Sequence, residues 1–284
     1  MKKLSIFFFL LAGLLWLGCE EIPPEINPSM GNNNPNEPTP VEDQQRQVLI
    51  EEFTGVRCVN CPAGSAAIEG LLGIYGQRLV AISIHAGSFS PPYSDSQYDF
   101  RIDEGINLLS YLGSPLGYPT AVVDRKKFDG EFDLHLGRQQ WAGFIAQELL
   151  EEPKVKIDVQ NAYSDEDRKL EVTATLYVQE AIAEEDVRIS VAITESDIED
   201  LQLTPDSGTP DPNYKHKHVL RDMLTTYDGD PIGGPLAAGA VIEKTYAITL
   251  PNGWIAGNCQ VIVFVNVGGE NKDVLQLHQA GVTE

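Results

Sequence analysis

The chain has 284 residues, of which 42% are hydrophobic and 22% charged, so it can bury sizeable cores and is long enough for two domains. Asp and Glu number 42 against 20 Lys and Arg, which gives a formal net charge of −22. Because nucleic-acid binding needs a basic surface to contact phosphates, this balance argues against a nucleic-acid partner.

Residues 1–18 read as a secretion signal. A basic start, Met1-Lys2-Lys3, is followed by an apolar run, Leu4–Leu17, that is too short for a comfortable transmembrane helix. The run ends in Gly18-Cys19, which resembles the bacterial lipobox, where the Cys is lipidated and becomes the new N-terminus. The resemblance implies lipidation of Cys19. The alternative is an ordinary signal peptide cleaved nearby, with Cys19 an ordinary thiol.

Residues 19–47 are rich in Pro, Asn and Glu and show no apolar periodicity. Such a composition cannot bury enough surface to fold, so we expect an extended tether. A lipid at Cys19 and this tether would hold the folded part clear of a bilayer.

A Cys-x-x-Cys motif follows the first predicted strand. Val48–Phe53 reads as a buried strand, and Cys58 and Cys61 precede a predicted helix, Ala63–Tyr75. In the first turn of a helix, positions i and i+3 share a face, and the helix N-terminus stabilises a thiolate. We therefore expect Cys58 to attack a disulfide and Cys61 to be the less exposed resolving thiol. A structural disulfide and half of a zinc site are the alternatives, although no second Cys or Cys/His pair stands at zinc-site spacing.

The elements after this helix complete the pattern of a first domain, residues 48–152. They are expected at Leu79–His85 (strand), Phe100–Tyr111 (helix), Ala121–Asp124 (strand), Lys126–Gly130 (hairpin turn) and Leu134–Leu150 (helix). This order around a Cys-x-x-Cys resembles thioredoxin, so the fold expected here is an α/β thioredoxin-like domain.

The thioredoxin resemblance implies roles for particular residues. Pro119 matches the cis-proline beside the dithiol, and Tyr118 would present its backbone to an extended substrate. Glu52 matches the buried carboxylate that moves the proton of the resolving Cys, although Glu51 competes for the inward position. Arg57 stands where the family usually has Trp, and it would stabilise a Cys58 thiolate.

The period changes from helical to two after Glu152-Pro153. Alternating segments predict strands at 155–159, 170–178, 187–193, 243–250, 260–266 and 274–277. Several short strands with turns between them suggest a second domain, residues 153–284, that is an all-β immunoglobulin-like sandwich.

Three features of this second half invite a metal or redox interpretation. The Asp- and Pro-rich segment 196–214 lacks the order of a calcium loop, so a solvated loop is favoured. His216 and His218 alternate onto one strand face, but without a third ligand we favour structural histidines over a metal site. Cys259 reads as a buried apolar residue. We therefore expect no metal and no cofactor.

Two segments carry a second resemblance. E-E-F-T-G-x-x-C-x-x-C-P at 51–62 and H-K-H-V-L-R at 216–221 resemble the outer-membrane-protein-28-related lipoproteins of Bacteroidetes. The resemblance implies a lipid-anchored outer-membrane protein on the periplasmic or cell-surface face. We expect thiol-disulfide exchange with a protein partner through Cys58, Cys61, Glu52 and Pro119. The alternative is a non-enzymatic, adhesin-like surface module that uses both domains as a scaffold. It would bind a protein or glycan through the β domain or through aromatic side chains of the 87–98 loop.

Overall fold

The computed structural model describes residues 41, 44–206 and 208–283. The predicted signal peptide, Cys19 and most of the predicted tether therefore lie outside the described residues. Within the described part, no helix has both the length and the apolar character needed to cross a membrane.

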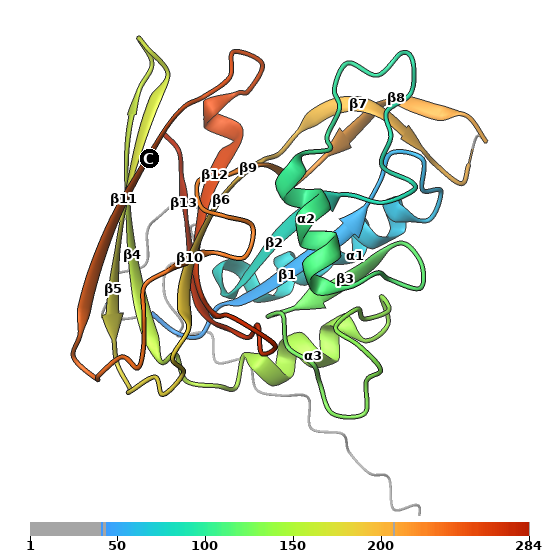
Figure 1. Cartoon of the computed structure of the whole chain (residues 1–284). Helices are drawn as coiled ribbons and strands as arrows, with labels where there is room; N and C mark the ends of the chain where they lie inside the picture. Colours follow the sequence, from blue (N-terminus) through green and yellow to red (C-terminus); the bar gives the residue numbers. More distant parts are fainter. Residues whose placement is uncertain (1–40, 42–43, 207, 284) are drawn as a thin grey trace, which may run out of the picture. The chain divides into compact units, whose positions relative to one another are not determined.

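A large mixed sheet forms the centre of the described structure (Figure 1). Its strands are β1 (Val48–Thr54), β2 (Leu79–His85), β3 (Thr120–Val123), β6 (Val187–Glu195), β9 (Val219–Met223), β10 (Asp230–Pro231), β12 (Cys259–Val267) and β13 (Val274–Gly281). The order is β13-β12-β6-β9-β2-β1-β3, with β10 paired to β6. β1 runs parallel to β2 and antiparallel to β3. β2 joins β9 through the parallel pair Ser83 and Val219.

Three helices cover the two faces of this sheet near β1. They are α1 (Cys61–Tyr75), α2 (Asp103–Leu112) and α3 (Trp141–Glu148). Because successive strand residues face opposite sides, Val48 and Ile50 pack with the helices α1 and α3, whereas Leu49 and Phe53 pack with α2. Every residue of β1 and β2 is buried, as expected for strands covered on both faces.

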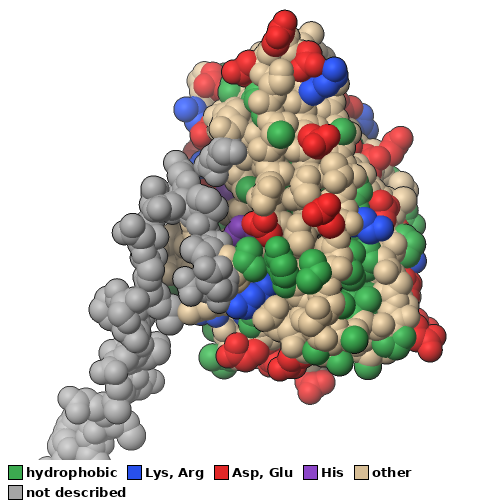
Figure 2. Space-filling view, turned by 90° about the vertical axis from the view of Figure 1, so that its left-hand side faces the viewer, with side chains coloured by type: hydrophobic (Ala, Val, Ile, Leu, Met, Phe, Trp, Pro, Cys, Tyr) green, Lys and Arg blue, Asp and Glu red, His purple; other side chains and the backbone are tan. Residues whose placement is uncertain are grey.

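A smaller sheet packs against the β6 and β12 end of the large one. It has the order β11-β5-β4 and consists of β4 (Val155–Ser164), β5 (Lys169–Val178) and β11 (Val241–Thr249). Alternate residues of β5, from Leu170 to Leu176, are buried against residues of β6 and β12 in one apolar cluster. Figure 2, which looks onto this side, shows carboxylates spread over the outer face.

The predicted fold class, a thioredoxin-like α/β domain followed by an all-β immunoglobulin-like sandwich, is wrong. Strands from both halves of the sequence form one sheet, because β9 and β6 continue it from β2. The apolar cluster around Leu49 and Phe53 also contains Leu220, Ile262 and Phe264. The sequence pattern changes period at Pro153, but the edge of β2 needs a strand partner and finds it in the second half.

The segment predicted as a solvated loop is largely a hairpin. β7 (Ile198–Leu203) pairs with β8 (Pro210–His216) in antiparallel register. Two helices are also shorter than predicted, since α2 begins at Asp103 and α3 spans only Trp141–Glu148. The expected hairpin around Lys126–Gly130 reduces to an isolated bridge between Ala121 and Leu136.

Candidate functional site

The two cysteines of the motif form a disulfide at the start of α1. Cys61 is the first residue of the helix, and the Cα atoms of Cys58 and Cys61 are 5.3 Å apart. Two tight turns prepare this geometry, because the Cys58 amide donates to the Gly55 carbonyl and the Cys61 amide donates to the Cys58 carbonyl, at 3.0 and 3.2 Å. The sulfurs meet as predicted, but not on a shared helix face: Cys58 lies before the helix, whose N-cap is Asn60, and the two turns bring the pair together.

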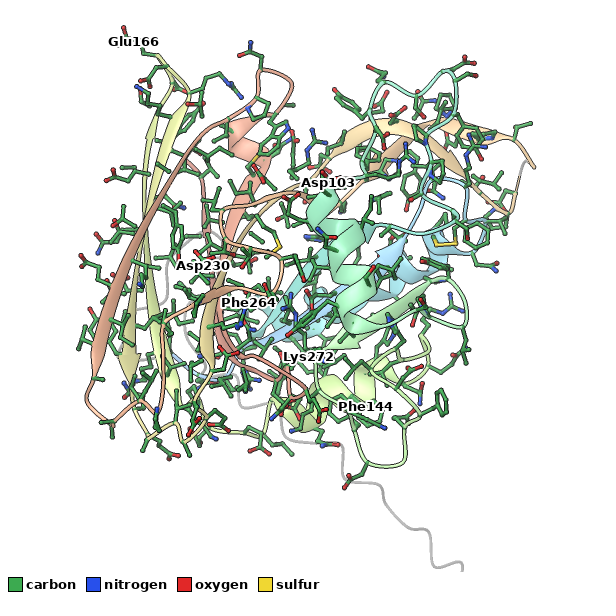
Figure 3. All side chains as sticks on the ribbon, in the orientation of Figure 1. Asp103, Phe144, Glu166, Asp230, Phe264 and Lys272 are labelled. Carbon is green, nitrogen blue, oxygen red and sulfur yellow. A yellow bond between two sulfur atoms is a disulfide. The ribbon has the colours of Figure 1, made fainter. Side chains whose placement is uncertain are left out.

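The disulfide is covered. Cys58 is 3% and Cys61 1% exposed, so the more exposed attacking sulfur expected from the sequence is closed off in this state. The β7–β8 hairpin lies over the loop that holds Cys58: Gln202 Nε2 donates to the Cys58 carbonyl at 3.1 Å, and the Leu203 amide donates to the Val56 carbonyl at 2.8 Å. Figure 3 shows the disulfide as a yellow bond below this hairpin.

Glu52 lies on the α1 face of β1 and is completely buried. The hydroxyls of Ser65 and Ser83 lie 3.5 and 3.4 Å from its Oε2 atom, and its Oε1 atom has no hydrogen-bond partner among the described residues. Burial without a cationic partner raises the pKa of Glu52 to about 8. The carboxyl is therefore mostly protonated at neutral pH.

Glu51, the competitor for this position, is equally buried but on the opposite face. Arg125 donates to both of its carboxylate oxygens, at 2.7 and 2.9 Å, and the guanidinium lies over the ring of Phe264. Both glutamates are thus inside the molecule. Glu51 is held as an ion pair, whereas Glu52 is not.

Gly64 lets α1 lie directly against Glu52 and Pro119. A Cβ atom at Gly64 would stand 2.4 Å from Glu52 Oε1 and 2.8 Å from two ring carbons of Pro119. Cys61 and Gly64 are buried residues one turn apart on the same helix face. The structure therefore gathers Cys61, Glu52 and Pro119 in one place.

The peptide bond between Tyr118 and Pro119 is cis, as predicted. The ring of Tyr118 packs edge-on against Phe89, with centroids 5.5 Å apart, and its hydroxyl fills the space where a side chain at Gly87 would stand. Phe89 is 41% and Val59 39% exposed. These two side chains give the surroundings of the disulfide an apolar outer surface.

Arg57 is engaged by the 87–98 loop. Its guanidinium donates to the carbonyls of Pro91 and Pro92 at 2.7 and 2.6 Å and lies 4.4 Å from the ring centre of Tyr93. Its amide donates to the Phe89 carbonyl at 2.9 Å. The hydrogen bonds of Arg57 thus fix the loop beside the disulfide, and its role toward a thiolate stays a prediction.

The two histidines of the His-Lys-His segment diverge. His218 and Lys217 bind the α1 residue Glu69, at 2.8 and 2.5 Å, and the hydrogen bond from His218 is the main reason that the pKa of Glu69 falls to about 2. His216 is buried against Phe100, and burial lowers its pKa to about 4. The prediction that both share one strand face is wrong, because β8 ends at His216 and His218 has a positive φ of 53°.

Sequence reasoning missed four side chains at this site: Ser65, Ser83, Gln202 and Tyr214. Ser65 stands four residues after Cys61 on α1, so helical spacing could have found it. Gln202 is 144 residues from Cys58 in sequence, and no local pattern connects them.

The model of the family described as "Outer membrane protein Omp28" matches residues 110–284. That range is more than half of the chain. The chain belongs to the Omp28 family of outer membrane proteins. No curated protein matches this Omp28-family chain.

Two solved structures of low sequence identity share its fold. HBP35 of Porphyromonas gingivalis superposes with a TM-score of 0.64 at 20% identity, covering 84% of this chain and 76% of that one. Protein AGR_C_4864 from Agrobacterium tumefaciens does so with a TM-score of 0.53 at 12% identity, covering 85% and 96%. A domain of the outer membrane lipoprotein Omp28 from P. gingivalis aligns at 18% identity over 46% and 88%, with a TM-score of 0.30. The first two likenesses extend across both predicted domains, which agrees with a continuous sheet.

Proposed function

We propose that this Omp28-family protein is anchored to the outer membrane through a lipid on Cys19 and exchanges disulfides with a protein partner through Cys58 and Cys61. One observation carries the exchange proposal: the Glu52 carboxyl is buried next to the helix that begins with Cys61, and no cation of the described residues pairs with it. Burying a carboxyl without a partner is costly, and such groups concentrate at functional sites.

In the reducing direction, the Cys58 thiolate attacks a partner disulfide, and one partner sulfur leaves as a thiolate. Cys61 then gives its proton to the ionised Glu52 carboxylate and attacks Cys58, which forms the Cys58–Cys61 bond and releases the second partner thiolate. Two electrons pass from the dithiol to the partner, whose thiolates take protons from solvent. The oxidising direction is the reverse. A pKa of about 8 suits Glu52 for exchanging this proton near neutral pH.

Access to the sulfurs requires the β7–β8 hairpin to lift from the Cys58 loop. Two polar contacts, those of Gln202 and Leu203, join it directly to that loop, and further bonds hold its ends to the 87–98 loop and to α1. With each such bond worth on the order of 1 kcal/mol net, an open minority state is energetically accessible. In that state Val59, Phe89 and the backbone of Tyr118 would meet the partner.

The test is reduction of a protein disulfide such as that of insulin by the dithiol-reduced protein. We expect activity in the wild type and none in Cys58→Ser. Activity should be unchanged in the control Cys259→Ala. Cys259 is the one free cysteine of the described chain, and its thiol is buried in the core at β12. A wild type that exchanges with neither insulin nor glutathione would contradict the proposal.

A non-enzymatic surface module is the second candidate, and the burial of both sulfurs favours it. Its disulfide would be purely structural, with Phe89, Tyr93 and Tyr98 contacting a ligand. The reduction potential separates the two functions. A structural bridge is expected below about −300 mV, out of reach of glutathione, and an exchanging one above that value.

A further inference from the structure

The proton of Glu52 needs a path between the buried carboxyl and solvent. The side chain is completely buried, yet under the proposed function its proton must leave and return in every cycle. Hydrogen-bonding groups that reach Glu52 are therefore the candidates for carrying the proton to solvent. Among the described residues these are the hydroxyls of Ser65 and Ser83.

The branch through Ser83 leads inward. Ser83 is itself only 6% exposed and lies in the middle of β2, between β1 and β9. Its amide donates to the His218 carbonyl at 2.7 Å.

The branch through Ser65 leads outward. Ser65 is half-buried on α1, and the phenol of Tyr214 on β8 lies near enough for Ser65 to lower its pKa. The end of β8 is held against α1 there, because Lys217 bonds to Glu69, one turn beyond Ser65. Tyr214 is itself only partly buried. The pKa of Tyr214 is raised, first by burial and further by the carboxyls of Glu52 and Glu69.

We propose that Ser65 and Tyr214 form the route by which protons pass between Glu52 and solvent. The Ser65 hydroxyl accepts the proton of Glu52 while passing its own to the Tyr214 hydroxyl, which passes its own to water. Only O–H bonds are made and broken, and one proton leaves. The use of the route in turnover rests on the proposed function, whereas the route itself does not. β8 thus supplies the outer member of a route whose other members, Glu52 and Ser65, come from β1 and α1.

The test follows the Glu52 proton directly. The oxidised full chain is moved from H2O to D2O under mildly acidic conditions, and the shift of the buried carboxylic C=O stretch is timed by infrared spectroscopy, with Glu52→Gln identifying the band. We expect Tyr214→Phe and Ser65→Ala each to slow the exchange by about tenfold or more, as for other positioned proton-transfer groups. Tyr214→Phe keeps the ring that packs edge-on against His216 at 4.9 Å.

Tyr98→Phe is the matched control. Its ring lies 5.9 Å from that of Phe100 in the neighbouring aromatic cluster, and it has no contact with Ser65 or Glu52 among the interactions of the described chain. We expect exchange in this variant at the wild-type rate.

Equal exchange rates in the wild type, Tyr214→Phe and Ser65→Ala would overturn the route, since the proton would then leave by local opening of the fold. Slowed exchange in both variants supports it even if insulin reduction fails in the wild type. In that case the proposed function falls and the route stands, so the two failures are distinguishable.

Discussion

Glu52 is a side chain whose surroundings oppose its ordinary ionisation. Burial raises its pKa from 4.5 to about 8, so the folded protein holds a proton that the unfolded chain has released at neutral pH. Because the pKa of Glu52 is raised in the folded state, proton binding at Glu52 contributes fully to stability below about pH 4.5. It is lost progressively as pH rises toward about 8.

Glu52→Gln is therefore expected to raise the free energy of unfolding near neutral pH by about 3 kcal/mol and to leave it almost unchanged near pH 4.5. Denaturant unfolding of both proteins from about pH 5 to about pH 9 measures this. The buried Asp124, with a pKa raised to about 7 by burial, contributes a slope of the same sign to both proteins. The difference between the two curves therefore isolates Glu52, and parallel curves would show that Glu52 has no raised pKa.

Gly64 is the residue that sets the distance between α1 and the site. Gly64→Ala would place a methyl group 2.4 Å from Glu52 Oε1, so we expect it to destabilise the protein by about 1–3 kcal/mol and to alter the pH dependence just described. Gly70→Ala on the same helix is the control, because a Cβ there meets nothing within 4 Å. It should stabilise the protein slightly, by up to about 1 kcal/mol. Equal effects at the two positions would contradict the close approach at Gly64.

At the residue scale, the sequence was informative where chemistry is local. The spacing of Cys58 and Cys61 predicted their contact, and the thioredoxin resemblance pointed to Glu52 and the cis bond at Pro119. Gln202 and Tyr214 were out of reach because their roles arise only when β7 and β8 fold back over α1.

At the scale of elements, the β7–β8 hairpin lies over the loop that carries Cys58. It is fixed at several points: Asp200 accepts the amides of Gln97 and Tyr98 at 3.1 and 2.8 Å, and Glu69 on α1 holds Lys217 and His218 just past its end. Gln202 bonds directly to the Cys58 carbonyl and is only 2% exposed.

Gln202→Ala is expected to speed reduction of the Cys58–Cys61 disulfide by excess dithiothreitol by about tenfold, because a hydrogen bond of the closed state is lost. Stopped-flow measurement of the reduction rate tests this. Gln160→Ala on β4 is the control, since the Gln160 side chain is exposed and, within the described part of the chain, bonds to Asp158 on its own strand. An unchanged rate in Gln202→Ala would show that the hairpin does not limit access.

The β7–β8 hairpin was predicted to be a solvated loop, and the prediction was wrong for a physical reason. Its Asp and Pro residues and its weak apolar alternation are typical of solvated loops. What stabilises it is contact with the 87–98 loop and with α1, and such tertiary contacts leave no periodic trace in the local sequence.

At the scale of the whole molecule, the first half does not contain a complete core. Phe264 packs with Leu49 and Phe53, and its ring lies against the guanidinium of Arg125. β2 also depends on β9 for a neighbour. The predicted domain limits, 48–152 and 153–284, mark the change of sequence pattern at Pro153, and as limits of domains they stay a prediction.

A chain of residues 44–152 is expected to lack a cooperative unfolding transition, because loss of the second half exposes one face of the Leu49 and Phe53 cluster. Circular dichroism with urea denaturation, compared with residues 44–284, tests this. A sharp transition in the short chain would show that the first half folds alone.

Individual strands were predictable from alternation, as β5 and β12 show, because half-buried and buried strands leave a local pattern. Their assembly was not. The same alternating segments can form a closed sandwich or extend another sheet. Which arrangement forms depends on which edge β2 leaves unpaired.

The attachment of the N-terminal segment has a mechanical consequence. Arg46, just before β1, donates to Asp124 at 2.6 Å and to the Val274 carbonyl at 2.8 Å, and Gln47 bonds to Gln276. β1 then runs between β2 and β3. If Cys19 is anchored as proposed, tension from the anchor would enter the fold at these hydrogen bonds of Arg46 and Gln47, ahead of β1 and of the disulfide that follows it.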